Sequence, residues 1–243
     1  MFTGIVVSSH FTRSNYCSLF KGQSFTHSIQ TKMSKSKINI LQTGYCLDCP
    51  TDKSKFTADC TVTLIENENS SPILVDTSGP WASEKLKSDI HGAGYTLDDI
   101  KTVVCTHGHS DHIGNLNLFP KAKFFVGFDI FCRNVYETFD FKSSSAKYVV
   151  RDDIEIIATP GHTNADISVI VKNTELGTVV IAGDTFENDK DYLNAGSVWK
   201  SLSENIEQQE ISRDKILSIA DYIVPGHGKM FSVSVYKNEA CNH

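Results

Sequence analysis

The chain has 243 residues, of which 40% are hydrophobic and 21% are charged, a composition typical of a globular protein with a sizeable core. This length excludes a large multidomain assembly, and the composition excludes a chain that is disordered throughout. The net charge of −6 has the wrong sign for a protein that binds nucleic acid mainly through a basic face.

The charge is unevenly distributed, and the N-terminal segment differs from the rest. All 29 Asp and Glu residues lie after position 47, whereas five of the 23 Lys and Arg residues precede Ile38, so residues 38–243 carry a net charge of −11. Residues 1–37 are basic and lack an apolar stretch long enough for a secretory signal or a membrane span. We interpret them as a disordered extension. The alternatives are a mitochondrial transit peptide and an upstream segment before a start at Met33.

Strands and helices alternate along the remaining sequence. Turn residues and hydrophobic periodicity predict strands over 38–42, 60–65 and 73–76, followed by a helix over 81–91 and a capping box at 96–99. Further strands are predicted over 101–106, 123–126, 154–158, 167–171 and 178–182. Most of 192–220 is predicted to be helical, and a last strand covers 222–225. The second and third strands are expected to form a hairpin. This order predicts an α/β protein, a four-layer αββα sandwich made of two similar halves.

The seven cysteines are odd in number and scattered, which favours a reducing compartment over a disulfide framework. We therefore expect the protein in the cytosol or nucleus. Cys46 and Cys49 have the spacing of redox and zinc sites, but no second Cys pair follows, so no role is assigned to them.

The segment His107-Gly-His109-Ser-Asp111-His112 carries the strongest chemical signal in the sequence. It places four metal-capable side chains within six positions, directly after a predicted strand. His107 and His109 can project from one side because strand side chains alternate, while the start of the next helix turns Asp111 and His112 elsewhere. One segment can thus contribute ligands to two metal ions.

Two closed metal sites need more ligands than this segment offers, and suitable residues follow other predicted strands. His162 follows the 154–158 strand, Asp184 follows the 178–182 strand, and His227 follows the 222–225 strand, each directly after a glycine. Taken singly, each residue has an ordinary structural explanation in a turn or at the surface. Their shared position after strands points to one site.

These motifs resemble those of the metallo-beta-lactamase superfamily, whose HxHxDH, Gly-His-Thr, Gly-Asp-Thr and Gly-His-Gly segments occur here in the family's order. The resemblance implies a metallo-beta-lactamase domain over 38–243. It also implies that seven residues bind two metal ions: His107, His109 and His162 one ion, Asp111, His112 and His227 the other, with Asp184 bridging them. Within that set, Asp111, His112 and Asp184 are the implied catalytic residues.

Two divalent ions about 3.5 to 4 Å apart can share a hydroxide and lower its pKa toward neutrality, so hydrolysis needs no Ser or Cys nucleophile. Imidazole and carboxylate ligands without thiolates suit two Zn²⁺ per chain, and Mn²⁺ or iron would accept the same set.

Several branches of the superfamily carry additional domains for which this chain has no room, such as the β-CASP and flavodoxin domains. A conventional glyoxalase II carries a helical domain after the last histidine, where this sequence has 16 residues. The strings Thr106–Asn115 and Asp166–Val171 are closer to a compact branch. Resemblance to that branch implies a cytosolic and nuclear homodimer that cuts histone pre-mRNA at its 3′ end as an endoribonuclease, using the bridging hydroxide.

Three functional hypotheses follow. The first is this RNA phosphodiesterase, the second a glyoxalase-II-like thioester hydrolase, and the third a metal-bearing binding module without turnover. The acidic body predicts poor nonspecific affinity for RNA unless a local basic strip, such as Lys142, Lys147 and Arg151, lies near the cleft.

Overall fold

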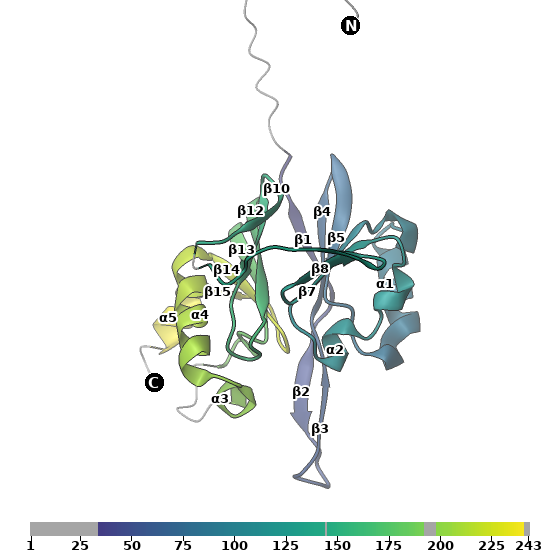
Figure 1. Cartoon of the computed structure of the whole chain (residues 1–243). Helices are drawn as coiled ribbons and strands as arrows, with labels where there is room; N and C mark the ends of the chain where they lie inside the picture. The colour runs from purple at the N-terminus through teal and green to yellow at the C-terminus, as the bar shows by residue number, and fades with distance from the viewer. Residues whose placement is uncertain (1–33, 144, 192–197, 241–243) are drawn as a thin grey trace, which may run out of the picture. The chain divides into compact units, whose positions relative to one another are not determined.

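The computed structural model describes residues 34–143, 145–191 and 198–240 (Figure 1). The predicted N-terminal extension lies outside the described residues except for its last four, and the first strand already begins at Lys37. Within the described residues, no helix is long and apolar enough to cross a membrane.

Seven strands form the first sheet, in the order β1-β4-β5-β6-β7-β8-β9. Their bounds are β1 Lys37–Gln42, β4 Val62–Asn67, β5 Ser70–Val75, β6 Thr102–Cys105, β7 Lys123–Val126, β8 Asp129–Cys132 and β9 Val135–Glu137. The predicted hairpin is confirmed, because β4 and β5 pair antiparallel around a turn in which Asn67 Oδ1 accepts a hydrogen bond from the backbone of Asn69. β5, β6 and β7 are parallel, so their carboxyl ends meet at one edge.

Six strands form the second sheet, in the order β10-β11-β12-β13-β14-β15. Their bounds are β10 Tyr148–Arg151, β11 Ile154–Ala158, β12 Ile167–Thr174, β13 Gly177–Gly183, β14 Tyr222–Pro225 and β15 Phe231–Ser232. β13 and β14 are parallel, and β11 runs in the same direction because it is antiparallel to β12, which is antiparallel to β13. The carboxyl ends of these three strands therefore also share an edge.

Helices cover the outer face of each sheet (Figure 1). α1 (Ser83–Gly92) and α2 (Ser110–Ile113) lie beside the first sheet, while α3 (Val198–Leu202), α4 (Ile206–Ile219) and α5 (Val233–Ala240) lie beside the second. α1 buries Leu86 and Ile90, four residues apart and so on one face, against the outer side of the first sheet. Short 3-10 turns occur at Pro80–Ala82, Leu97–Asp99 and Leu116–Leu118.

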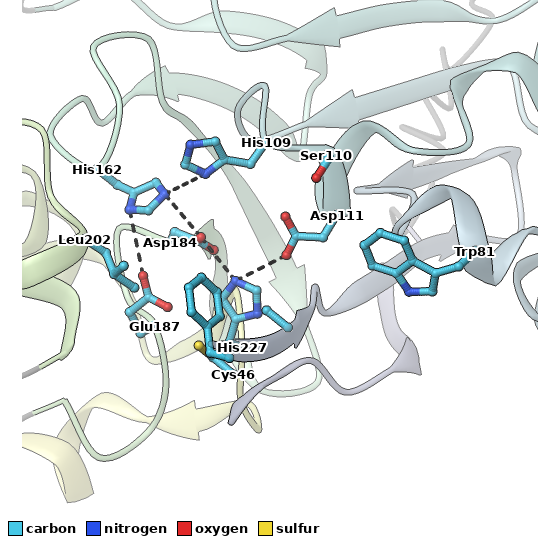
Figure 2. Close-up of a pocket in the computed structure, with 12 residues that line it drawn as sticks. Cys46, Trp81, His109, Ser110, Asp111, His162, Asp184, Glu187, Leu202 and His227 are labelled. Atoms are coloured by element: carbon cyan, nitrogen blue, oxygen red, sulfur yellow. Dashed lines mark hydrogen bonds and ion pairs between the residues drawn. The ribbon is translucent and has the colours of Figure 1, made fainter. Parts of the chain in front are cut away.

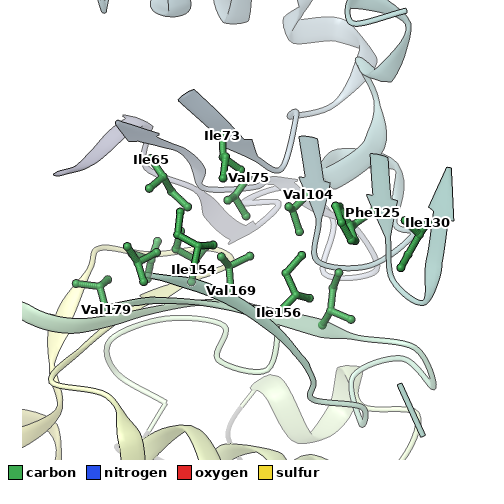
Figure 3. Close-up of a cluster of buried hydrophobic side chains, with 14 of the residues drawn as sticks. Ile65, Ile73, Val75, Val104, Phe125, Ile130, Ile154, Ile156, Val169 and Val179 are labelled. Carbon is green, nitrogen blue, oxygen red and sulfur yellow. The ribbon is translucent and has the colours of Figure 1, made fainter. Parts of the chain in front are cut away.

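The strand sequences alternate between two apolar surfaces, which explains the four layers. Ile73 and Val75 of β5 face the second sheet, whereas Leu74 faces α1, and in β12 Val169 and Val171 face the first sheet while Ile170 faces the helices. Figure 3 shows the resulting core between the sheets. The predicted αββα sandwich is confirmed.

The main departure from the sequence prediction is a separate hairpin of β2 (Tyr45–Asp48) and β3 (Phe56–Asp59), which extends away from the sandwich (Figure 1). Cys46 and Cys49 lie on this hairpin and its turn as free thiols. The hairpin was missed because it is short and mostly exposed, with no apolar run to reveal it. The predicted capping box at Thr96 and Asp99 is present, but it begins a 3-10 turn.

Candidate metal centre

The predicted ligands gather where the carboxyl ends of strands from both sheets meet. His107 follows β6 in the first sheet, and His162, Asp184 and His227 follow β11, β13 and β14 in the second. Asp111 lies on α2, four residues after His107. The fold thus brings residues up to 120 positions apart into one cluster, as the sequence predicts (Figure 2).

His107, His109 and His162, here called the three-histidine group, point ring nitrogens at one another. His109 Nδ1 lies 2.9 Å from His107 Nε2 and 3.0 Å from His162 Nε2. A tetrahedral Zn²⁺ with bonds of about 2.05 Å holds neighbouring ligand atoms roughly 3.3 Å apart, so this spacing is close to that of a zinc site. The group can hold one divalent cation.

Asp111, His112 and His227, here called the Asp111 group, are more open. Asp111 Oδ2 lies 3.6 Å from His227 Nε2 and 3.9 Å from His112 Nε2. All three ligand atoms lie within 4.8 Å of one another, which suits a second cation with one carboxylate and two imidazole ligands.

Asp184 stands between the two groups. Its Oδ1 lies 3.2 Å from His112 Nε2, and its Oδ2 lies 3.2 Å from His227 Nε2. Toward the other group, Asp184 Oδ2 lies 3.3 Å from His162 Nε2 and 3.7 Å from His107 Nε2. One carboxylate therefore faces both groups, which is the position required of a bridging ligand.

Several polar atoms in this cluster are buried without a hydrogen-bond partner among the described residues, although burying such atoms is costly. They are His112 Nε2, His162 Nδ1, Asp184 Oδ1 and both carboxylate oxygens of Glu187. His112 Nε2 and Asp184 Oδ1 are the atoms that a metal ion would engage. The donor set and these free atoms fit a metal centre.

Asp76 and Thr106 orient two of the histidines. Asp76 Oδ2 lies 3.0 Å from His112 Nδ1, and Thr106 Oγ1 lies 3.2 Å from His107 Nδ1 and 3.1 Å from Asp76 Oδ2. The Nε2 atoms are thereby left to face the centre. Asp76 adopts a left-handed backbone conformation, with φ of 59°, and its carboxylate also accepts a hydrogen bond from the Thr106 backbone at 2.8 Å.

Backbone groups orient His227, and two glycines permit the close approach of the segments. His227 Nδ1 lies 3.0 Å from the Asp59 carbonyl and 3.1 Å from the Tyr45 carbonyl. A Cβ atom on Gly226 would overlap Asp184 Oδ1, and one on Gly183 would overlap the Thr106 side chain. A larger residue at Gly183 would push the two sheets apart at the site, and one at Gly226 would displace the Asp184 carboxylate.

Burial and charge separate the histidines into two kinds. Burial, reinforced by neighbouring His112, lowers the pKa of His107 well below its usual value, and burial also lowers the pKa of His162. Burial acts the same way on His112 and His227, but the Asp184 carboxylate outweighs it. The Asp184 carboxylate raises the pKa of His112 well above its usual value, with help from Asp76, and it raises the pKa of His227 to about 9.

The centre opens into a cavity of about 400 Å³ with an acidic interior and an apolar rim (Figure 2). No Lys or Arg contributes to its lining among the described residues. The lining consists of Cys46, Phe56, Ala58, Trp81, His109, Ser110, Asp111, His162, Asp184, Glu187, Leu202 and His227. Trp81 and Phe56 are 64% and 59% exposed, so large aromatic faces lie at the entrance.

All seven predicted ligand residues lie in this cluster, but sequence reasoning missed Asp76, Asp59 and Glu187. Asp76 had a detectable signal, since it is an acidic residue at the end of a predicted strand, close to where the ligands follow theirs. Glu187 had none, because its burial depends on the packing of the loop after β13.

The proposed basic strip does not form beside the cavity. Lys147 Nζ pairs with Glu155 at 3.3 Å and Arg151 Nε pairs with Asp153 at 2.6 Å. Lys142 lines a different cavity, so none of the three faces the centre.

Comparison with known proteins gives matches in sequence and in fold. A family model described as the metallo-beta-lactamase superfamily matches residues 57–128. Metallo-beta-lactamase domain-containing protein 1 of Xenopus laevis is 45% identical over 202 residues, covering 82% of this chain and 83% of the relative. The human protein of the same name is 46% identical over 171 residues, covering 70% of this chain and 62% of the relative, so the match spans less than two thirds of the human protein.

Among solved structures, AidC, described as a dizinc quorum-quenching lactonase, superimposes with a TM-score of 0.52 at 18% sequence identity. The match covers 71% of this chain and 74% of that one. At this identity the likeness concerns the fold.

Proposed function

Because this chain belongs to the metallo-beta-lactamase superfamily, we propose that it is a metal-dependent hydrolase of RNA, an endoribonuclease that cuts histone pre-mRNA at its 3′ end. The superfamily accounts for metal-dependent hydrolysis. The choice of RNA rests on the resemblance of the motif strings to the compact branch and on the features of the cavity described below.

The observation that carries the proposal is the position of Asp184 between the two ligand groups. The three-histidine group would hold one ion, the Asp111 group the other, and Asp184 both, with two Zn²⁺ per chain as the proposed content and Mn²⁺ or iron as alternatives. Bound there, the metals would supply a water of lowered pKa and Lewis-acid stabilisation of developing negative charge.

The remaining groups of the cavity suit an anionic substrate once the cations are counted. Asp111, Asp184 and Glu187 contribute at most three negative charges to the lining, fewer than the four positive charges of two divalent ions. A bound hydroxide would bring the sum to zero, so the loaded cavity would not repel a phosphodiester, whose oxygens the ions themselves could bind. Trp81 and Phe56 offer exposed aromatic faces at the entrance, on which the bases flanking the scissile phosphate can stack.

A second cavity, of about 600 Å³, is lined partly by the segment that carries His162 and would extend the surface available to RNA. Pro160 and Asn164 of this segment line it, together with Lys142 and Lys215. Lys142 forms no ion pair with a carboxylate among the described residues, so its charge can meet a phosphate, whereas Lys215 Nζ donates to the Ala158 carbonyl at 3.2 Å and contributes less.

A second candidate function is hydrolysis of a thioester or another acyl compound, as in a glyoxalase-II-like enzyme. The absence of Lys and Arg from the described lining of the metal cavity favours it, because an uncharged acyl group needs no basic contact. The fold shared with a lactonase is compatible with the same chemistry.

The discriminating experiment presents the zinc-loaded protein with a histone pre-mRNA 3′ fragment and, separately, with S-lactoylglutathione. We expect cleavage of the RNA and no hydrolysis of the thioester, with Asp184→Asn inactive and His91→Ala, at the exposed end of α1, fully active. Thioester hydrolysis without RNA cleavage would replace the proposal by the second candidate. Two bound ions with no turnover of either substrate would indicate a binding module.

The homodimer and the location in the cytosol and nucleus remain predictions of the same resemblance. Size-exclusion chromatography with light scattering tests the first, and imaging of the tagged full chain tests the second.

A further inference from the structure

Four histidines of the centre direct Nε2 toward Asp184, which leaves Nδ1 to be held from behind. Three of these Nδ1 atoms have partners: Thr106 for His107, Asp76 for His112, and backbone carbonyls for His227. The fourth, His162 Nδ1, is buried without a hydrogen-bond partner among the described residues. The pattern predicts a group placed to hold it.

Glu187 is that group. It follows β13 three residues after Asp184, its side chain is 1% exposed, and its Oε1 lies 3.8 Å from His162 Nδ1 (Figure 2). Both of its carboxylate oxygens lack a hydrogen-bond partner among the described residues. A buried carboxylate and a buried imidazole nitrogen thus face each other, and each lacks what the other provides.

The backbone of Glu187 is fixed on both sides, so its side chain has a defined direction. Its amide donates to Asp191 Oδ2 at 2.9 Å, and its carbonyl accepts from the His227 amide at 2.7 Å. The nearby Arg213 is occupied by Asp191 at 2.9 Å. Among the described residues, Glu187 therefore forms no ion pair with a lysine or arginine side chain.

We propose that Glu187 is a positioning residue that accepts a hydrogen bond from His162 Nδ1 and thereby directs His162 Nε2 toward the metal centre. This role rests on the proposed metal-dependent function. Closing the gap from 3.8 Å to ordinary hydrogen-bond length requires a movement of roughly 0.6 to 1.1 Å. A carboxylate behind a metal-binding histidine fixes its tautomer and typically changes metal affinity by about 10- to 100-fold.

The competing explanation is that Glu187 binds metal itself, since Asp184, Glu187 and His227 offer ligand atoms within 4.8 Å of one another. The two roles differ in what a glutamine can do. An amide oxygen still accepts a hydrogen bond from an imidazole N–H, but it is a much poorer ligand than a carboxylate.

The experiment measures zinc affinity by chelator competition and zinc content per chain in Glu187→Gln and Glu187→Leu, with Glu210→Gln and Glu210→Leu as controls. Glu210 is exposed and pairs with Lys200, away from the cavity. We expect Glu187→Leu to lower affinity about 10- to 100-fold and Glu187→Gln to stay within about threefold of the wild type, both still able to bind two ions. Unchanged affinity in Glu187→Leu, or loss of one ion in both variants, overturns the proposal.

A double-mutant cycle tests whether Glu187 acts through His162. In a His162→Ala background, Glu187→Leu should cause no further loss of zinc affinity, because the residue it orients is gone. An additional loss as large as in the wild-type background would overturn the assignment. These measurements concern zinc binding alone, so failure to cleave RNA leaves them interpretable, whereas a wild-type protein that binds no zinc would defeat both proposals.

Thermal unfolding of the metal-free protein distinguishes a positioning role of Glu187 from a purely structural one. Replacing a buried, unpartnered carboxylate should leave the metal-free variants at least as stable as the wild type while zinc affinity falls in Glu187→Leu. Metal-free variants that unfold several degrees lower would show that Glu187 supports the fold instead.

Discussion

The two ligand groups of the centre differ in geometry and in charge. In the three-histidine group, neighbouring nitrogens lie 2.9 and 3.0 Å apart, and the pKa values of His107 and His162 are lowered, so these rings are neutral. In the Asp111 group, the distances from Asp111 are 3.6 and 3.9 Å, and the pKa values of His112 and His227 are raised. The neutral imidazoles of the three-histidine group can bind a cation directly, whereas His112 and His227 of the Asp111 group must first release protons.

The cause of this difference is where the carboxylates lie. Asp184 Oδ1 faces His112, and Asp76 supports the same ring from behind at 3.0 Å, so His112 is placed between two negative groups. His107 has only the Thr106 hydroxyl behind it. We therefore expect the three-histidine group to bind metal more tightly than the Asp111 group does at low pH.

The largest effect should come from removing the group that the two sites share. Asp184→Asn is expected to eliminate at least one bound ion and to lower activity more than about 100-fold, because the amide cannot bridge two cations. Metal analysis and the RNA cleavage assay check this. Full activity with two retained ions would contradict the bridging assignment, and His91→Ala is the unaffected control.

Changing the pH should sharpen the difference between the groups. His227 has a pKa of about 9 in the metal-free protein, so a metal ion must displace its proton at neutral pH, and occupancy of the Asp111 group should rise between pH 6.5 and 9. Zinc titrations at several pH values, with proton release recorded, test this. Two ions binding with equal affinity and no proton release at pH 6.5 would contradict it.

The same raised pKa affects the stability of the metal-free protein. Because the folded pKa of His227 is about 9 and the unfolded value is about 6.5, its contribution is fully present below pH 6.5 and is lost as the pH rises through 9. The melting temperature of the chelator-treated protein should therefore fall over this range. His227→Gln, which does not titrate, should show a smaller fall.

Removing the support of one histidine should affect one group more than the other. Thr106→Val keeps the side-chain shape but removes the hydroxyl beside His107 Nδ1, so zinc affinity of the three-histidine group should fall about 10-fold. Competition with chelators of graded strength resolves the two affinities. Thr106 Oγ1 also lies 3.3 Å from His112 Nδ1, but His112 keeps Asp76 at 3.0 Å as a second partner, whereas His107 does not. An equal fall in both groups would show that the hydroxyl supports His112 as much as His107.

The smallest effect on metal binding should come from the rim. Trp81→Ala is expected to leave zinc content unchanged and to weaken RNA binding about fivefold, since stacking on an aromatic side chain contributes about 1 to 3 kcal/mol per base. The KM for the RNA fragment measures this. A change in bound zinc would mean that Trp81 supports the centre rather than the substrate.

The sequence predicted the sandwich and the clustering of the ligand residues because both follow from local patterns. Buried strands such as β6 are visible as apolar runs, and residues placed after parallel strands meet at one edge. Glu187 and the β2–β3 hairpin could not be found in this way. The burial of Glu187 depends on Asp191 and His227, and Phe56 reaches the cavity only because the hairpin extends beside it.

The central claim is that Asp184 bridges two metal ions. Anomalous diffraction at the zinc edge from crystals of the zinc-loaded protein tests it most directly. We predict two peaks about 3.5 to 4 Å apart on either side of the Asp184 carboxylate, one at the three-histidine group and one at the Asp111 group. A single peak, or a second ion held without Asp184, would contradict the account.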